Sequence, residues 1–535
     1  MATDCAWELH GASAGSEQSR CTTPRSRQAV LRPAGRAQRV IDAIDGEHRE
    51  LGVLALGLDY RGERARMALD LGYQDHHIDA PRPSVTPSGA LPDAPDARRS
   101  FAQPWTYTDE RDVFGVARAE YDLSDTVMAW GAVGVRDGEE SNVLANPTAD
   151  GAGHLTVYRF DNRREDRVVT GEAGLRAAFA TGRVGHRVSV SASVYRLDSK
   201  NAYAMGGFGT AVGTLTAPRA VAPIATTLFG GELSDPLTTI RTRTRSLALA
   251  DTLAFADERV MLTLGARQQT LEQYSYAYAT GAQTDRYDAD ALTPVGAVVF
   301  KLGRQWSIYA NYAEALQPGQ VVPATSGGVP LSNVGEVLDP FTSRQYELGA
   351  KYDSGRVGAT AALFRIAQPN TVVADGRMST DGEQRNQGLE LSGYGEVAEG
   401  LRVLGGFTLM EATLQRTQGG VNAGNDALGV PRHQANLGLE WDWHAVPGLT
   451  TEARAVHTGR QYADAANSRE LPAWTRMDLG VRYGFAAGGR HWSLRARVDN
   501  VFDLDYWAST GGASGANYLV LGAPRTYTVS LSVDL

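Results

Sequence analysis

The C-terminal end of the chain shows a strict two-residue alternation of apolar and polar side chains. After a turn at residues 522–524, apolar residues occupy every second position from Tyr527 to Leu535, with Thr, Ser or Asp between them. A period of two predicts a β-strand with one face in an apolar medium and the other in water. Lipid covers the apolar face of such a strand in an outer-membrane barrel, and a second sheet covers it in a soluble sandwich.

The same alternation recurs along the chain, for example at residues 66–74, 188–195 and 260–267. Arg and Asp occur on the second face, where a water-filled lumen tolerates them and a dry core does not. A large soluble β-protein such as a propeller is the alternative, but no repeat of about 40 residues is visible. The chain also lacks the run of about 18 apolar residues that a transmembrane helix needs. We therefore predict an all-β transmembrane antiparallel barrel.

Two kinds of connection separate the predicted strands. Tight polar turns with Gly or Asp are typical of hairpins, and nine are visible, at residues 60–63, 122–125, 181–183, 256–259, 302–304, 353–356, 398–400, 446–448 and 487–490. Long Gly- and Pro-rich connections alternate with them, at residues 74–112, 198–241, 317–341, 415–431 and 508–522. Short turns at one end and long loops at the other are the asymmetry of bacterial outer-membrane barrels.

The direction of the strands raises a question about the N-terminal side. Nine hairpins and the closing strand make about nineteen strands from near Glu50, so residues 51–60 and the last strand run in the same direction. Two such strands cannot close an antiparallel barrel, and we expect strands before Leu51 to be missing. We predict that residues 1–45 are irregular or disordered, with a mis-called start as our interpretation, and that residues 46–535 form the barrel. Both cysteines, Cys5 and Cys21, lie in the first segment, which lacks the pattern of a secretory signal peptide.

Composition and local motifs point away from catalysis and nucleic-acid binding. The net charge is −9 and no large basic block is present, so we expect no nucleic-acid partner. No Ser/His/Asp arrangement stands out, which predicts that the protein is not an enzyme. His76 and His77 lie near Asp75 and Asp79, but the stretch lacks spaced partners, and a solvated loop is the preferred interpretation over a metal site. A phosphate-binding loop is not expected at the glycines Gly206, Gly207, Gly209 and Gly213.

Six segments together resemble the TonB-dependent siderophore receptors of Gram-negative outer membranes. They are SIYANYAEALQPG at residues 307–319, YELGAK at 346–351, VPRH at 430–433, LPAWTRMDLG at 471–480, VDNVFDLDYW at 498–507 and GAPRT at 522–526. The segments occur in the order of the family, and the resemblance extends from about Leu51 to Leu535. Leu535 departs from the aromatic residue with which the family usually ends.

The resemblance implies a 22-stranded barrel in the outer membrane, preceded in the family by a signal peptide, a TonB box and a plug domain. It implies uptake of a ferric siderophore, energised by TonB in intact relatives. We recognise no signal peptide, box or plug here, so we expect the barrel part of such a receptor, not competent for energised transport alone. A passive outer-membrane pore and a non-functional receptor fragment are the alternatives. The expected partners are a ferric siderophore and outer-membrane lipid, and we expect a monomer.

Two groups of residues carry the predictions about individual side chains. Asn500 and Asp503 are expected to cap the turn around Phe502, and Tyr506 and Trp507 to lie in the interfacial girdle. Arg476 and Arg525 are expected either in an ion-pair network of the wall or in contact with a plug. The iron arrives inside its chelator, so no cofactor or metal site is expected, and stacking and hydrogen bonding suffice for capture. The ligand-contact candidates are loop aromatics, namely Tyr203, Phe208, Phe229, Tyr276, Tyr278, Trp507 and Tyr518.

Overall fold

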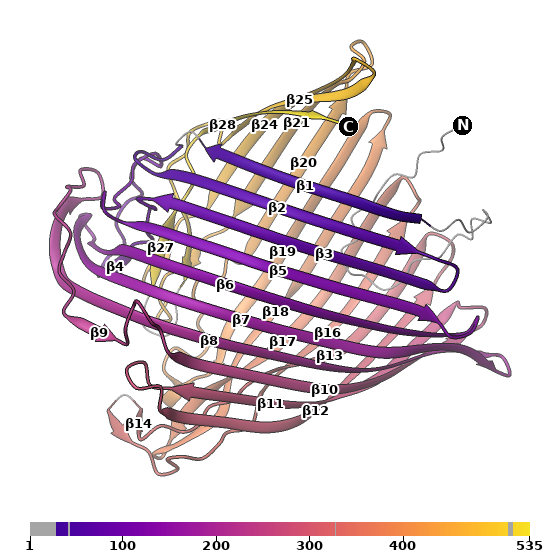
Figure 1. The fold of residues 1–535 in the computed structure, drawn as a ribbon, viewed down its shortest axis with the longest axis horizontal. Helices are drawn as coiled ribbons and strands as arrows, with labels where there is room; N and C mark the ends of the chain where they lie inside the picture. The colour runs from indigo at the N-terminus through magenta and orange to yellow at the C-terminus, as the bar shows by residue number, and fades with distance from the viewer. Residues whose placement is uncertain (1–27, 41–42, 327, 512–516, 535) are drawn as a thin grey trace.

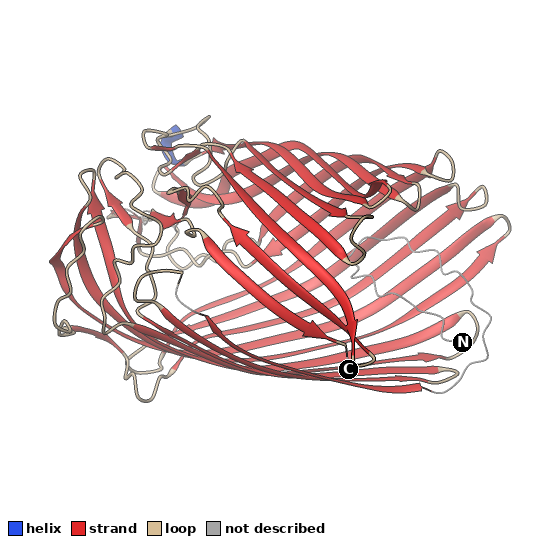
Figure 2. Ribbon diagram, turned by 90° about the horizontal axis from the view of Figure 1, so that it is seen from above, coloured by secondary structure: helices blue, strands red, loops and turns tan. Residues whose placement is uncertain are grey.

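One antiparallel sheet dominates the computed structural model, which describes residues 28–40, 43–326, 328–511 and 517–534. It contains 22 strands and curls round, so that the strands of the near wall in Figure 1 cross those of the far wall. Figure 2 shows the same wall from above, with loops gathered at one end. No helix in the described parts of the chain is long and apolar enough to cross a membrane.

Consecutive long strands pair with each other from β1 to β28. The near wall consists of β1 (Gln28–Val40), β2 (His48–Arg61), β3 (Ala65–Asp79), β5 (Tyr107–Asp122), β6 (Val127–Asp150), β7 (His154–Thr181), β8 (Val184–Thr214), β10 (Thr238–Phe255), β11 (Val260–Tyr276) and β12 (Gln283–Lys301). The sheet then continues as β13 (Trp306–Gln317), β16 (Phe341–Asp353), β17 (Val357–Ala374), β18 (Arg377–Ala398), β19 (Leu401–Arg416), β20 (His433–Asp442), β21 (Leu449–Thr458), β24 (Trp474–Ala487), β25 (Arg490–Asp499) and β28 (Thr526–Val533).

Short elements lie at the end of the sheet that carries the long loops. β4 (Thr86–Ser88) pairs with β6, and β9 (Leu228–Gly230) pairs with β8. Three small hairpins lie in the loops: β14 (Thr325–Ser326) with β15 (Val329–Pro330), β22 (Gln461–Tyr462) with β23 (Glu470–Leu471), and β26 (Trp507–Gly511) with β27 (Tyr518–Leu521). A single 3-10 turn, η1 (Gln418–Gly420), follows β19.

All nine predicted tight turns are confirmed, because each connects two strands that pair in a hairpin. The predicted loops at residues 74–112 and 198–241 are wrong at their edges. β3, β8 and β10 extend into them, and β6, β7 and β8 are 24, 28 and 31 residues long. Backbone pairing continues past the point where the apolar alternation ends, so composition alone misplaces the ends of these strands.

The prediction of an irregular segment through residue 45 is wrong for Gln28–Val40. This stretch forms β1, which pairs antiparallel with β2 along its whole length, from Gln28 opposite Arg61 to Val40 opposite Arg49. The prediction that the strands before Leu51 are missing is therefore wrong for this one strand. The strand carries no clear alternation and contains Pro33, which strands tolerate at a sheet edge. Within the part of the chain that the structure describes, no ladder joins β1 to β28.

The register assigns the side chains of the wall to an outward face and a lumen face. Residues directly opposite each other across a ladder share a face. The outward face carries a belt of exposed apolar side chains, such as Val133 at 61%, Leu249 at 57% and Leu363 at 56%. The inward face carries ion pairs such as Arg66 with Asp122 at 2.7 Å. The alternation thus divides a polar interior from an apolar exterior.

Candidate functional site at the mouth of the barrel

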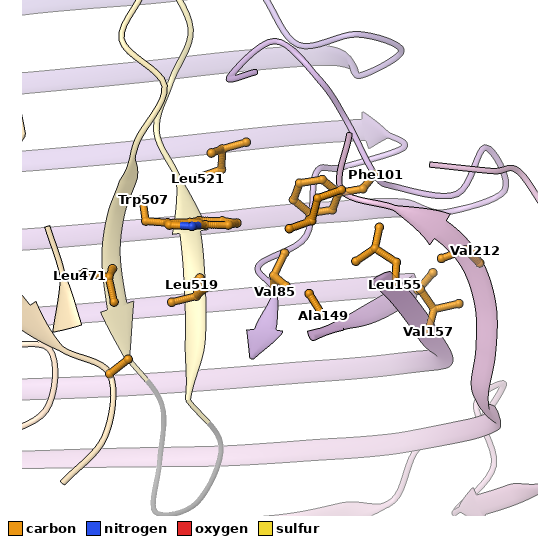
Figure 3. Packing of buried hydrophobic residues seen from close by; sticks show 13 residues of the cluster. Val85, Phe101, Ala149, Leu155, Val157, Val212, Leu471, Trp507, Leu519 and Leu521 are labelled. Atoms are coloured by element: carbon orange, nitrogen blue, oxygen red, sulfur yellow. The ribbon is translucent and has the colours of Figure 1, made fainter. Parts of the chain in front are cut away.

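A compact hydrophobic core lies at the long-loop end, which we call the mouth. It joins residues of the loop between β3 and β5, such as Val85 and Phe101, to residues of the β26–β27 hairpin, such as Trp507 and Leu519. Figure 3 shows Trp507 and Leu519 on one side of this core and Val85 and Leu155 on the other. The apolar side chains of the mouth are covered by protein, in contrast to those of the belt.

Backbone and side-chain hydrogen bonds fix the two halves of the mouth core. Val85 and Leu519 bond to each other through both backbone groups, with N–O distances of 2.9 and 2.7 Å. The indole N–H of Trp507 donates to the carbonyl of Pro92 at 2.9 Å. The first and the last loops of the barrel are therefore held together at this point.

Arg82 is the main polar contact across the same junction. Its guanidinium donates to the carbonyls of Ala97, Leu521 and Gly522, the last two at 3.0 and 2.9 Å. Burial among these groups lowers the pKa of Arg82 below its ordinary value. The Asp505 carboxylate adds a contact by accepting from the Ala97 backbone N–H at 2.7 Å.

Aromatic side chains gather on a neighbouring part of the mouth. Tyr203 of β8 meets Tyr278 edge-on, with ring centroids 5.2 Å apart, and stacks on Phe160 at 6.4 Å. Phe208 stacks on Tyr158 at 5.2 Å. A Cβ at Gly230 would lie 2.1 Å from the Tyr203 ring, so the pairing of β9 with β8 requires glycine there. These rings form a surface suited to an organic chelator.

The structure brings only part of the predicted ligand group together. Phe229 lies opposite Ala204, on the face of the sheet away from Tyr203, and is 63% exposed, whereas Tyr276 packs on Arg241 at 5.8 Å. Tyr203 and Phe208 lie on a strand, not in a loop. Tyr518 is exposed on β27, and Trp507 is 5% exposed inside the mouth core. The predicted set therefore separates into a Tyr203 group and a group on the β26–β27 hairpin.

Sequence reasoning missed three aromatic residues and their cation. Tyr158, Phe160 and Trp105 belong to the mouth, and Arg159 lies 5.6 Å above the Trp105 ring. Arg159 also pairs with Asp161 at 2.7 Å and donates to the carbonyl of Ile224 at 2.9 Å. The alternation of Val157, Tyr158, Arg159 and Phe160 offers no periodic signal, so only the fold reveals this group.

Below the mouth, the lumen wall is polar. A depression of about 470 Å³ lies against β13, β16, β18 and β21, and its lining includes Tyr309, Glu347, Glu390 and Arg454. The Tyr309 hydroxyl donates to Glu347. Carboxylates and a guanidinium facing one space suit hydrated or polar cargo.

The motif at residues 498–507 has a structural role. Asn500 accepts from the Leu504 N–H at 2.9 Å and donates to the carbonyls of Leu504 and Ala523, so the predicted capping is confirmed. Asp503 pairs with Arg525 at 3.0 Å. The prediction of an interfacial position for Tyr506 and Trp507 is wrong, since both are buried, at 8% and 5% exposure. The hairpin turns them into the mouth.

Charged residues of the C-terminal strands form a network within the wall. Arg476 lies 3.1 Å from Asp478, and Arg525 pairs with Asp503, which supports the wall alternative for both arginines. Outside the spanning strands, the hydrogen bond from Arg432 to Asp426 raises the pKa of that guanidinium. These pairs stabilise the wall and the loop after β19.

The His76–His77 stretch is a strand end, not the predicted loop. His77 lies between Asp109 and Asp79, and its Nε2 is 3.1 Å from the latter. His76 lies 3.5 Å from Glu110. In the described ranges, no group of three or more His, Cys, Asp or Glu side chains could hold a metal ion.

Comparison with known proteins identifies the family of this barrel. A model of the family "TonB dependent receptor-like, beta-barrel" matches residues 49–501. This chain belongs to that family. The family consists of receptors in the outer membrane of Gram-negative bacteria, and this chain shares that location.

Individual relatives agree with the family assignment. The ferrichrome receptor FcuA of Yersinia enterocolitica is 35% identical over 497 residues, which cover 92% of this chain and 65% of FcuA. The crystal structure of BauA, the ferric preacinetobactin receptor of Acinetobacter baumannii, superimposes with a TM-score of 0.86 at 31% identity, covering 95% of this chain and 75% of BauA. The siderophore receptor PiuA of the same species has a TM-score of 0.79 at 18% identity. The chain thus spans 65% of the length of FcuA.

Proposed function

We propose that this chain is the barrel of an outer-membrane receptor that captures a ferric siderophore for uptake, with β1 added to the predicted barrel residues 46–535. Ferrichrome is the first ligand to test, because FcuA, named a ferrichrome receptor, is 35% identical over 92% of the chain. The aromatic mouth above a polar lumen supports this function, since it offers stacking surfaces for the organic shell of a chelate. TonB is the proposed energy source, and the barrel acts as a monomer that binds no cofactor and catalyses no reaction.

The Tyr203 group is the proposed contact surface for the ligand. Tyr203 and Tyr278 lie edge to face, and Tyr203 stacks on Phe160. The exposed Phe229 of β9 lies on the other face of the sheet and is a separate candidate. Phe208, which stacks on Tyr158, belongs to the same strand pair, and Tyr276 and Tyr518 are separate candidates at other points of the mouth. Trp507 supports the surface from the core because its indole N–H is already bonded to Pro92.

Equilibrium binding of radiolabelled ferrichrome to the full chain, refolded in detergent micelles, tests the proposal. The double variant Tyr203→Ala/Tyr278→Ala is expected to bind about fivefold more weakly, since an aromatic pair contributes about 1 kcal/mol. The matched control is Trp441→Ala, which removes an outward aromatic of β20 that is 51% exposed.

Three results would contradict the proposal. Absence of saturable binding by the folded wild-type chain would overturn capture of ferrichrome, and the same assay with ferric preacinetobactin would then test the next ligand. An equal loss in Trp441→Ala and the double variant would remove the Tyr203 group from the site. Large conductance in planar bilayers that no ferric chelate blocks would favour the passive pore.

A further inference from the structure

The polar depression in the lumen wall has the size of a small-molecule site. Its volume of about 470 Å³ lies within the range of roughly 300–1,000 Å³ that ligand pockets occupy. Pairing of β18 with β19 places Ser392 opposite Gly406 and Glu390 opposite Thr408, and all four line the depression. β18 and β19 belong to the far wall in Figure 1, whereas β8, which carries Tyr203, belongs to the near wall. The depression is therefore separate from the Tyr203 group.

Several polar side chains of the depression have no partner within the protein. Among the residues that the structure describes, the side chains of Gln434 and Asn436 make no hydrogen bond. In the same described ranges, Glu390 and Arg454 make neither a hydrogen bond nor an ion pair. Two amides, a carboxylate and a guanidinium thus face one space with their hydrogen-bonding capacity unused.

Charged residues elsewhere on the lumen face are paired, which sets the depression apart. Arg402 of β19 lies 2.6 Å from Asp442. Arg66 of β3 lies 2.7 Å from Asp122. The wall can therefore satisfy its lumen-facing arginines with carboxylates, and it does not do so across the depression.

The unpartnered groups suit a neutral ligand that carries both donors and acceptors. The Gln434 and Asn436 amides can each donate and accept. The Glu390 carboxylate accepts, the Arg454 guanidinium donates, and their charges have opposite signs. Peptide amides and hydroxyls offer the matching mixture. A concave space with a few convergent polar groups is typical of a ligand site.

We propose that the depression is a second binding site for the chelate, deeper in the lumen than the Tyr203 group. It holds a neutral chelate whose organic shell carries amide or hydroxyl groups. This inference rests on the proposed function. The Tyr203 group stacks on the apolar parts of the shell, whereas the depression forms hydrogen bonds with its polar parts. A chelate that leaves the mouth can therefore bind again within the lumen.

Protection of an introduced thiol tests the site in the full chain, refolded in detergent micelles. In Ser392→Cys, a water-soluble maleimide should react about tenfold more slowly when ferrichrome is present at about ten times the Kd, since about a tenth of the sites are then empty. Peptide mass spectrometry separates this thiol from Cys5 and Cys21. The matched control is Ser191→Cys on the lumen face of β8, whose labelling rate should not change.

Filling the depression should remove this site and leave the mouth intact. A Cβ at Gly406 would lie 3.5 Å from the Asn436 amide nitrogen, an ordinary contact, so Gly406→Trp extends into the depression. Saturation binding of radiolabelled ferrichrome should show a second molecule per wild-type chain, which Gly406→Trp loses. The control is Gly185→Trp on the lumen face of β8, where a Cβ would lie 3.5 Å from that of Ala254.

The other outcomes separate this inference from the proposed function. Unchanged labelling of Ser392→Cys at saturating ferrichrome would overturn the second site and leave capture at the mouth intact. Equal slowing in Ser191→Cys would also overturn it, because the chelate would then fill the lumen without preferring one wall. Loss of all binding in Gly406→Trp, with no loss in Tyr203→Ala/Tyr278→Ala, would keep the depression and overturn the mouth.

Two further results complete the test. Absence of any ferrichrome binding by the folded wild-type chain would overturn both proposals for this ligand. If Gly406→Trp fails to fold, as judged by heat-modifiable migration in gels, the labelling of Ser392→Cys still decides, because that substitution replaces one small side chain with another.

Discussion

The belt and the mouth core are both apolar, but the side chains of the belt are exposed on the protein surface and those of the mouth core are buried. In the belt, side chains such as Val133 and Leu363 are more than half exposed, and lipid completes their surroundings. In the mouth, Val85, Phe101 and Leu519 are fully buried at 0% exposure, and protein surrounds them. The wall therefore requires only that one face of each strand is apolar, whereas the mouth requires shape complementarity between loops that are distant in sequence.

The largest expected effect contrasts two phenylalanines, one from each region. Phe101→Ala should destabilise the mouth by about 3–5 kcal/mol, because it leaves a cavity in a packed core. The control Phe407→Ala removes an outward ring that is 38% exposed, and lipid can fill the space. Hydrogen exchange at the Val85 and Leu519 amides measures the effect. Equal protection in the two variants would show that the mouth core is not tightly packed.

A charge placed in the belt tests the other region. Leu363→Arg should destabilise the barrel by about 2–4 kcal/mol, the cost of a cation near the bilayer midplane. Thr360→Arg on the same strand faces the polar depression with Glu347 and Glu390, and should cost much less. Denaturant unfolding in lipid vesicles compares the two. A larger loss for Thr360→Arg would reverse the assignment of the faces.

Removing the polar contact across the mouth should have an intermediate effect. Arg82→Met leaves the carbonyls of Leu521 and Gly522 without this donor, at a cost of about 1–3 kcal/mol. Arg98→Met in the same loop is the control, because its side chain is exposed. Limited proteolysis of the loop between β3 and β5 should be faster in Arg82→Met alone. Identical cleavage in both variants would assign the junction to apolar packing.

The smallest effect concerns pH at the tip of the β6–β7 hairpin. Hydrogen bonds from the His154 side chain and backbone lower the pKa of Asp150 below its ordinary 3.8. A depressed pKa in the folded state means that this contribution is fully present above pH 3.8 and is lost as the pH falls below it. Exchange of the His154 amide should accelerate over that range in the wild type. Asp150→Asn should remove the dependence, and an unchanged profile would contradict the role of the carboxylate.

The sequence predicted the wall well because the wall is a local pattern. Alternation and turn chemistry depend on neighbouring residues, so all nine tight turns were correct. Strand β1 was missed, because its residues lack alternation and its position is defined by backbone pairing with β2. The extensions of β6–β8 were missed for a related reason, since their upper parts carry polar residues on both faces.

The candidate site was harder to predict than the wall. Tyr203 and Tyr278 are 75 positions apart in a chain whose loops contain many aromatic residues. No local sequence pattern predicts that these two rings are in contact. Trp507 shows the converse error. An amphipathic aromatic near a strand end suits the girdle on average, but the β26–β27 hairpin turns this one into a core that only the assembled loops create.

The contacts of Arg82 with Leu521 and Gly522 join residues about 440 positions apart, almost the whole length of the barrel. Closing so long a loop is slow compared with forming hairpins, and its entropy must be offset before the contact stabilises anything. The mouth core can therefore form only after the last strand has taken its place. Protection of the loop between β3 and β5 from protease consequently reports the moment at which assembly of the barrel is finished.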